Sequence, residues 1–206
     1  MAVPLMQLRR LVRARLGIPT TDDFMPDHVI DDHVNLAIQS VEAEYHWPWQ
    51  DVVEQVTVTH DAPDIPVAPA WRATRAVFCA EAELLLVAPG DMLSWNESYS
   101  DVPKLWCPIG DVIAVRPVVN SDTVLTHYWY TQPVWLREDT DVSNIPDQYA
   151  GAIVAKASEL LAARESSGGD ATRHGAEYTQ MLTKMRRDVR RSTSPVRIRV
   201  RPGGWV

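Results

Sequence analysis

Histidine and cysteine, the side chains that most often bind metals in proteins, are few and scattered in this chain of 206 residues. His28 and His33 are five residues apart, so on a helix they point to different sides and lack the four-residue spacing of a zinc-binding pair. No histidine has a histidine or cysteine four residues away. Cys79 and Cys107 show no CxxC spacing and are expected to be reduced, buried thiols. The sequence therefore predicts no metal site.

Carboxylates could carry acid–base chemistry. Glu81 and Glu83 are alternate residues of an expected strand and would point to the same side. We favour solvated charges at a strand end, because glutamate is mostly exposed in folded proteins. The acids Glu138, Asp139 and Asp141 are likewise interpreted as a solvated loop rather than a metal site. Since P-loop, GxGxxG, GxSxG and metalloprotease signatures are also missing, we expect neither an enzyme nor a cofactor.

The chain has eight tryptophans against two phenylalanines. These tryptophans could form a platform on which sugars or bases stack. Because no cations are interleaved with them, we favour anchors in the core and at interfaces. The tryptophans are residues 47, 49, 71, 95, 106, 129, 135 and 205.

Charge is unevenly distributed along the chain. Residues 183–202 hold eight cations and one anion, a net charge of +7, so the total of −7 leaves −14 for the remainder. An acidic body argues against general DNA binding, since that affinity comes largely from neutralising phosphates. A basic tail on an acidic body favours an arm that binds an acidic protein surface, on a partner or on another copy.

Residues that typically begin or end helices indicate the N-terminal helices. Residues 4–16 are expected to form a helix that starts at Pro4 and is capped by Gly17. The arginine-rich start superficially resembles a mitochondrial transit peptide, but such a peptide needs no C-cap, so a structural helix is favoured. A second amphipathic stripe runs from Ile30 to Tyr45. In the first helix we expect one side to be apolar and the arginines to lie opposite: Leu5, Leu8, Leu11, Val12 and Leu16 against Arg9, Arg10 and Arg13.

From about residue 52 to residue 133 the hydrophobic period changes to two, which predicts strands. The segments 111–119 and 122–132 are expected to pair as a hairpin across Asn120–Asp122, with Pro117 marking a strand end. No apolar run approaches the roughly 18 residues that a membrane-spanning helix needs. The section therefore predicts antiparallel β structure in a protein without membrane contact.

The C-terminal part is expected to be helical. A loop of acids leads to a helix over residues 147–165, with Pro146 in its first turn. Asp170 should cap a further helix, and the short connection predicts an antiparallel helical hairpin. After Pro195, valine and isoleucine alternate with arginine, the pattern of a strand that adds to a sheet edge of another chain. The candidate interaction residues of this arm are Arg197, Ile198, Arg199, Val200, Arg201 and Trp205.

Together these elements predict an α+β fold. A small helical bundle would combine the N-terminal helices, residues 1–50, with the loop and helical hairpin of residues 138–192. An antiparallel β section, residues 51–137, would be inserted between them. Residues 193–206 would form an extended basic C-terminal arm.

Three stretches resemble the head-to-tail connector, or adaptor, proteins of tailed bacteriophages. Residues 8–45 contain a short basic helix, an aromatic and acidic linker, and a helix with the step Asn35-Leu36-Ala37. Residues 105–136 are similar to a tryptophan strand, a Gly-Asp turn, a strand ending in proline, and an aromatic strand before "PVWL". Residues 139–162 share the loop, the "IPDQY" start and the following helix. The order of these stretches carries the resemblance.

The resemblance implies a structural protein of the virion neck, made in the host cytoplasm. A ring of about twelve copies would dock below the portal protein, extend the DNA channel and present a platform to the next neck or tail component. An acidic lumen would let DNA slide through without specific binding. Two alternatives stay open: a DNA-binding module that uses the basic C-terminal region, or a small enzyme without recognisable motifs.

Overall fold

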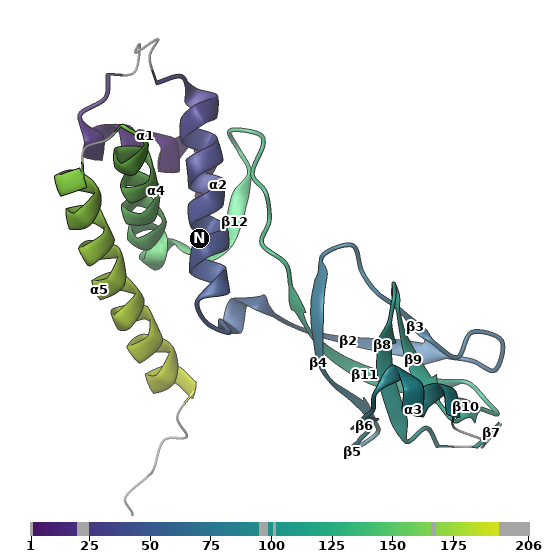
Figure 1. Ribbon diagram of the computed structural model, residues 1–206. Coiled ribbons are helices and arrows are strands. Elements are labelled where there is room, and N and C mark those ends of the chain that lie inside the picture. The colour runs from purple at the N-terminus through teal and green to yellow at the C-terminus, as the bar shows by residue number, and fades with distance from the viewer. Residues whose placement is uncertain (1, 20–24, 95–98, 101, 166–167, 194–206) are drawn as a thin grey trace, which may run out of the picture. The chain divides into compact units, whose positions relative to one another are not determined.

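The computed structural model describes residues 2–19, 25–94, 99–100, 102–165 and 168–193. The chain divides into two compact units: unit 1 comprises Met1–Pro48 and Trp135–Val206, and unit 2 comprises Trp49–Val134. Unit 1 is mainly helical and unit 2 is mainly β structure (Figure 1). Helices occur together with mainly antiparallel strands, in agreement with the predicted α+β class, although two pairs of short strands are parallel.

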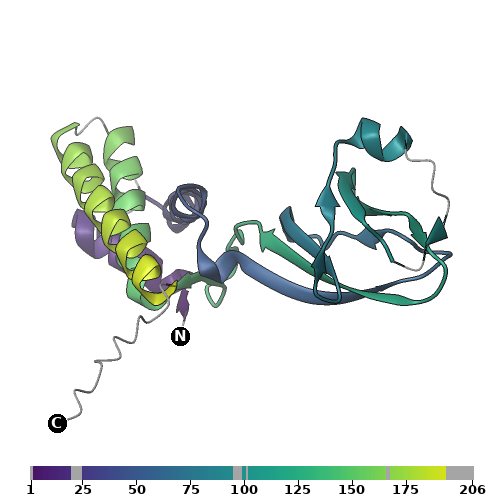
Figure 2. The same cartoon turned by 90° about the horizontal axis from the view of Figure 1, so that it is seen from below.

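Unit 1 is built around α4, which packs against three other helices. In Figures 1 and 2, α5 lies along the length of α4. Many small side chains of α4 are buried, including Ala152, Ala155 and Ala157, as expected for a helix with neighbours on several sides. The elements are β1 (Ala2–Pro4), α1 (Leu5–Leu16), α2 (Asp27–Ala43), β12 (Val142–Pro146), the 3₁₀ turn η2 (Asp147–Tyr149), α4 (Ala150–Arg164) and α5 (Gly168–Thr193).

The helix α1 ends as its sequence predicts but buries a slightly different side. Gly17 adopts a left-handed conformation with φ of 69°, and its N–H donates to the carbonyl of Arg13. Leu5, Leu8 and Val12 are fully buried. The expected amphipathic side is wrong at two positions, because Leu11 is 42% exposed and Arg13 only 5% exposed. Arg13 tolerates burial since three acceptors from other segments surround its guanidinium, as described below.

The segment before α4 is a strand, which corrects the predicted loop. β12 pairs with β1 in antiparallel orientation, with Ala2 opposite Pro146 and Pro4 opposite Val142. Pro146 is extended, with φ of −56° and ψ of 143°, so it ends the strand instead of occupying the first helical turn. A proline suits this place because a strand end does not require its missing N–H. Asp170 is likewise not the cap of α5, which already begins at Gly168.

Unit 2 contains two four-stranded sheets, in the orders β2-β11-β4-β5 and β3-β9-β8-β6. One hydrophobic cluster includes Val77 and Leu125 of the first sheet and Trp106 and Ile113 of the second, so the sheets pack against each other. The elements are η1 (Pro48–Gln50), β2 (Asp51–Val58), β3 (Ile65–Pro66), β4 (Trp71–Cys79), β5 (Ala82–Glu83), β6 (Leu85–Leu86), α3 (Pro89–Ser94), β7 (Tyr99–Ser100), β8 (Leu105–Ile109), β9 (Val112–Arg116), β10 (Val118–Val119) and β11 (Thr123–Thr131).

The predicted hairpin between residues 111–119 and 122–132 is wrong. β9 pairs with β3 and β8, β10 pairs with β7, and β11 lies between β2 and β4 in the other sheet. The strand β9 does end just before Pro117, as the proline predicts. Arg116 is held in the second sheet because its Nη1 donates to Asp64 Oδ1 at 2.7 Å. The chain therefore changes sheets where the sequence suggests a simple turn.

A buried histidine lies in the first sheet of unit 2. His127 is 1% exposed, with Nδ1 3.1 Å from Glu54 Oε1 and Nε2 2.9 Å from Thr74 Oγ1. Burial lowers the pKa of His127 and outweighs the opposing effect of the Glu54 carboxylate. The folded protein therefore favours the neutral imidazole at neutral pH.

Because the pKa of His127 is lower in the folded than in the unfolded chain, acid should destabilise unit 2. The contribution of neutral His127 to stability is complete above its pKa in the unfolded chain, about 6.5. It is lost as the pH falls towards the lower pKa of the folded chain, because the unfolded chain takes up the proton first. Urea unfolding of the full chain between neutral and mildly acidic pH, followed by tryptophan fluorescence, measures this dependence. We expect His127→Gln to reduce it and the exposed His28→Gln to leave it unchanged. Equal pH dependence in all three proteins would contradict this role.

Candidate interaction surfaces

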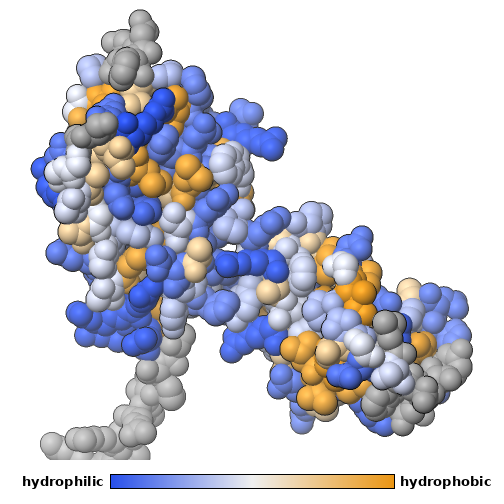
Figure 3. Space-filling model, in the orientation of Figure 1, coloured by the Kyte–Doolittle hydropathy of each residue, from blue (hydrophilic) through white to orange (hydrophobic). Residues whose placement is uncertain are grey.

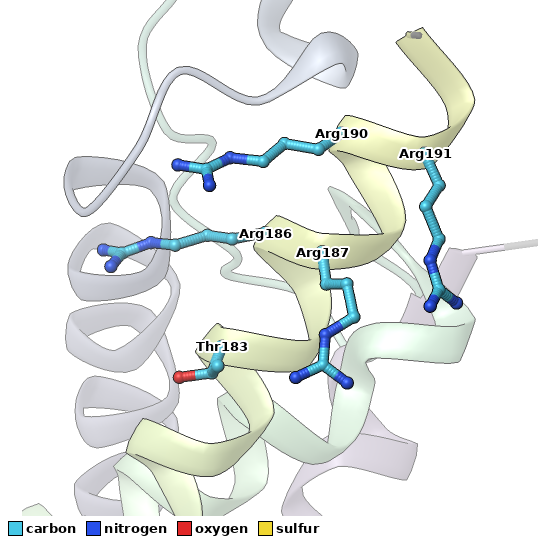
Figure 4. A pocket seen from close by; sticks show the side chains of 5 residues that line it. All are labelled: Thr183, Arg186, Arg187, Arg190 and Arg191. Atoms are coloured by element: carbon cyan, nitrogen blue, oxygen red, sulfur yellow. The ribbon is translucent and has the colours of Figure 1, made fainter.

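The C-terminal end of α5 is strongly basic. Its residues 184–191 hold five cations and one carboxylate, a net charge of +4. Thr183 and four arginines line a hollow on this part of the helix (Figure 4). We call this segment the basic end of α5; its cations are Lys184, Arg186, Arg187, Arg190 and Arg191.

The arginines of the basic end extend to two sides of the helix. Arg186 and Arg190 extend in one direction and Arg187 and Arg191 in another (Figure 4). Arg186 Nη2 donates to the backbone carbonyl and to Oε2 of Glu44, each at 3.0 Å. Arg187 and Arg191 are exposed, and neither forms an ion pair within the described part of the chain. These two arginines, four residues apart on one helix, are therefore available to a partner.

The arm residues predicted from the sequence lie outside the described residues: Arg197, Ile198, Arg199, Val200, Arg201 and Trp205. Their role stays a prediction. The basic end of α5 comes shortly before them in the chain. The C-terminal run of positively charged residues therefore begins within a helix. The uneven charge of the sequence included these helix residues. The predicted interaction residues, however, were only those of the arm, which follow the alternating pattern.

An arginine on α1 joins two acidic segments on the surface of unit 1. Arg9 Nε and Nη2 donate to the two carboxylate oxygens of Asp31, each at 2.7 Å, and Nη2 also donates to Asp139 at 2.8 Å. A weaker contact at 3.3 Å reaches Asp27. The hydrogen bond to Asp31 is the largest cause that raises the pKa of Arg9, so the side chain is always charged. Arg9 thereby fixes the start of α2 next to the turn at residues 138–141.

Arg13 holds the chain on both sides of the α1–α2 connection. Its Nη1 donates to the carbonyl of Pro19 at 2.6 Å, and its Nη2 donates to the carbonyl of Met25 and to Asp27 Oδ1, each at 2.8 Å. These acceptors explain why a guanidinium is stable in a buried position. The start of α2 is thus fixed by two arginines of α1.

Asn35 in the middle of α2 holds the segment that follows unit 2. This residue is 2% exposed, its Nδ2 donates to the carbonyl of Leu136 at 2.9 Å, and its Oδ1 accepts from the N–H of Leu136 at 2.8 Å. The neighbouring Trp135 is 44% exposed, and Leu36 next to Asn35 is 43% exposed. An asparagine inside an apolar helical stripe was the available signal, but the sequence did not reveal its partner.

The three acids of the turn at residues 138–141 have separate roles. Asp139 binds Arg9, and the carboxylate of Asp141 accepts from the N–H groups of Glu138 and Arg137 at 2.9 and 2.8 Å. These two backbone bonds lower the pKa of Asp141. Glu138 is exposed and has no ion pair among the residues that the structure describes. The predicted solvated surface is confirmed for Glu138 and Asp139, which are exposed, and Asp139 in addition forms an ion pair with Arg9.

The structure also places the other residues considered for chemistry. Within the described residues, no group of three or more His, Cys, Asp or Glu side chains is arranged to hold a metal ion. His33 Nδ1 lies 2.7 Å from the carbonyl of Val29 in its own helix. Glu81 and Glu83 are exposed, as expected. No helix in the described ranges is long and apolar enough to cross a membrane.

Apolar side chains are exposed on both units, and Figure 3 shows them as patches among hydrophilic residues. Leu85 and Leu86 of the edge strand β6 are 64% and 56% exposed. In unit 1 the large exposed side chains include Trp135 and Leu36, which lie close to the turn at residues 138–141.

A comparison with protein families identifies the family of this chain. The family model described as SU10 adaptor protein matches residues 5–199, which include all of unit 2 and nearly all described residues of unit 1. No curated protein matches the chain.

Proposed function

Because the chain belongs to the SU10 adaptor protein family, a family of phage head–tail adaptors, we propose that about twelve copies assemble as a ring below the portal protein. Membership makes the chain a structural component of the virion at the head–tail junction and implies a role without catalysis. The family match over residues 5–199 is the observation that carries the proposal. The ring would extend the DNA channel and offer a platform to the next neck or tail protein.

The charge distribution supports a channel that DNA passes without binding. Outside residues 183–202 the chain carries a net charge of −14. Carboxylates that face a lumen would repel phosphates, so the genome could slide. The cations are concentrated at the C-terminal end, where they would serve protein contacts.

The ring is tested by mixing the purified protein with purified portals and imaging the complexes by electron microscopy. We expect one ring of adaptor density on one face of the portal, with rotational symmetry of about twelve. Portals without added density, together with adaptor that stays monomeric at micromolar concentration, would overturn the proposal.

DNA binding is the second candidate, and the exposed Arg187 and Arg191 favour it. Retention of the protein on double-stranded DNA separates the two functions. Binding through phosphates would be tight at low salt and fall steeply towards physiological salt. We expect weak retention at both, because the body of the chain is acidic.

We also propose that the arm, residues 193–206, leaves its own subunit and binds a neighbouring chain. Deleting residues 195–206 should then leave the melting temperature of the monomer unchanged and strongly reduce assembly on portals, measured by co-sedimentation. Replacing Arg197, Arg199 and Arg201 by glutamine in the full chain removes the charge of the arm but keeps its length, so it separates the contribution of charge to assembly from that of strand pairing. A truncated protein that docks with unchanged affinity would show that the arm has no such role.

A further inference from the structure

We propose that the basic end of α5 in one copy binds an acidic and aromatic surface of unit 1 in the next copy. This acceptor surface consists of the exposed side chains of Asp32, Leu36, Trp135 and Glu138. The inference rests on the proposed ring and names the two surfaces that close it.

The acceptor surface combines two segments that are far apart in the sequence but firmly joined. Asn35 binds both backbone groups of Leu136, and Arg9 binds Asp31 on one segment and Asp139 on the other. Rigid presentation reduces the entropy that binding would otherwise cost. The surface is therefore ordered before a partner arrives.

The chemistry of the acceptor surface fits arginine. The two segments that form it and the side chains that join them carry six carboxylates and three arginines, a net charge of −3: Asp27, Asp31, Asp32, Glu138, Asp139 and Asp141 against Arg9, Arg13 and Arg137. Asp32 and Glu138 have no ion pair among the described residues. Trp135 is an exposed aromatic side chain, over which a guanidinium can stack. Carboxylates beside a tryptophan are the surroundings that arginine side chains favour at interfaces.

The basic end of α5 is the matching donor, and in its own copy it lies away from Asp32 of the acceptor surface. Arg186 binds Glu44 at the C-terminal end of α2, twelve residues after Asp32. At the helical rise per residue this is about 18 Å along α2, more than a Debye length in physiological salt. Consistent with this distance, Arg187 and Arg191 have no ion pair in the described part of the chain.

Two different, complementary surfaces on one chain produce head-to-tail association, which closes into a ring when the rotation between copies fits. Exposed arginines on one copy would meet Asp32, Glu138 and Trp135 on the next. DNA phosphates are the competing occupant of the same arginines, and the experiment distinguishes them.

Charge reversal on each surface tests the pairing. The acceptor variant carries Asp32→Lys and Glu138→Lys, and the donor variant carries Arg187→Glu and Arg191→Glu. All four side chains are exposed, so the melting temperatures should stay close to that of the parent protein. Assembly is measured by native mass spectrometry and mass photometry, alone and with portals. We expect each variant alone to need at least about tenfold more protein for half-maximal assembly.

An equimolar mixture of the two variants gives the decisive result. Each acceptor variant can bind a donor variant on both sides, because lysine then meets glutamate and arginine meets aspartate. We therefore expect the mixture to regain rings that contain equal numbers of both variants. The control carries Arg10→Glu and Arg164→Glu, two exposed arginines outside both surfaces, and should assemble like the parent.

The outcomes separate this inference from the proposed function. If the parent protein forms no ring, alone or with portals, the proposed function is contradicted. Rings that form normally in both variants, or a mixture that fails to restore assembly, overturn only the pairing of these surfaces. If the donor variant assembles normally but loses salt-sensitive retention on DNA, the basic end is a DNA surface and the inference is wrong.

Discussion

Replacing Trp106 by alanine is expected to lower the free energy of unfolding of unit 2 by about 3–5 kcal/mol. Trp106 is 3% exposed, packs in the cluster between the two sheets, and donates from Nε1 to the carbonyl of Leu84 at 3.1 Å. The substitution leaves a large cavity and a buried carbonyl without its partner. Urea unfolding of the full chain, together with hydrogen exchange of β8 and β11, measures the loss.

Trp135 provides the matched control for this experiment. The same change, Trp135→Ala, removes a side chain that is 44% exposed and should alter stability by less than about 0.5 kcal/mol. Trp106→Phe keeps an aromatic ring but loses the hydrogen bond, so an intermediate loss of about 1–2 kcal/mol is expected. If Trp106→Ala and Trp135→Ala destabilised the chain equally, the assignment of Trp106 to the core of unit 2 would fail.

Asn35→Ala should lower the free energy of unfolding of unit 1 by about 2–4 kcal/mol. The variant leaves the N–H and the carbonyl of Leu136 without their side-chain partner in a buried position. Thermal unfolding by circular dichroism measures the helices of unit 1 directly.

Loss of Asn35 should also release the acceptor surface. Fluorescence anisotropy of Trp135, in a variant in which other tryptophans are replaced by phenylalanine where stability permits, would report greater mobility. Gln39→Ala, an exposed change on the same helix, serves as control and should have almost no effect. A fully stable Asn35→Ala protein would mean that other contacts hold residues 135 and 136 in place.

Local signals predicted some helix ends but not others, since Asp170 does not cap α5. Gly17 was correctly identified as the cap of α1, since a left-handed residue is a property of a few neighbouring positions. The buried side of the same helix was partly wrong, because Leu11 and Arg13 are only two positions apart and both sit next to Val12. The acceptors that bury Arg13 come from Pro19, Met25 and Asp27, and no periodicity in α1 reveals them.

Long-range pairing was the part that the sequence could not predict. Strands expected as neighbours belong to different sheets, because β11 pairs with β2 and β4 instead of the adjacent segment. Asp139 is exposed, as interpreted, but its ion pair with Arg9, 130 residues earlier in the chain, could not be predicted. The same limit applied to the tryptophans: composition suggested anchors, but only packing distinguishes Trp106 in the core from Trp135 at the surface.

The discontinuous chain path of unit 1 has a consequence for its synthesis on the ribosome. Unit 2 is one continuous stretch and can fold as soon as it emerges, whereas α1 and α2 must wait for β12, α4 and α5. At about 5–20 residues per second, the roughly 100 residues between the end of α2 and β12 take on the order of 5–20 seconds to translate. Until then, Asp32 and Trp135 do not form one surface and the arginines of α5 have not been made. Both surfaces of the proposed contact between copies are therefore complete only in a finished chain, so we expect assembly to follow the end of synthesis.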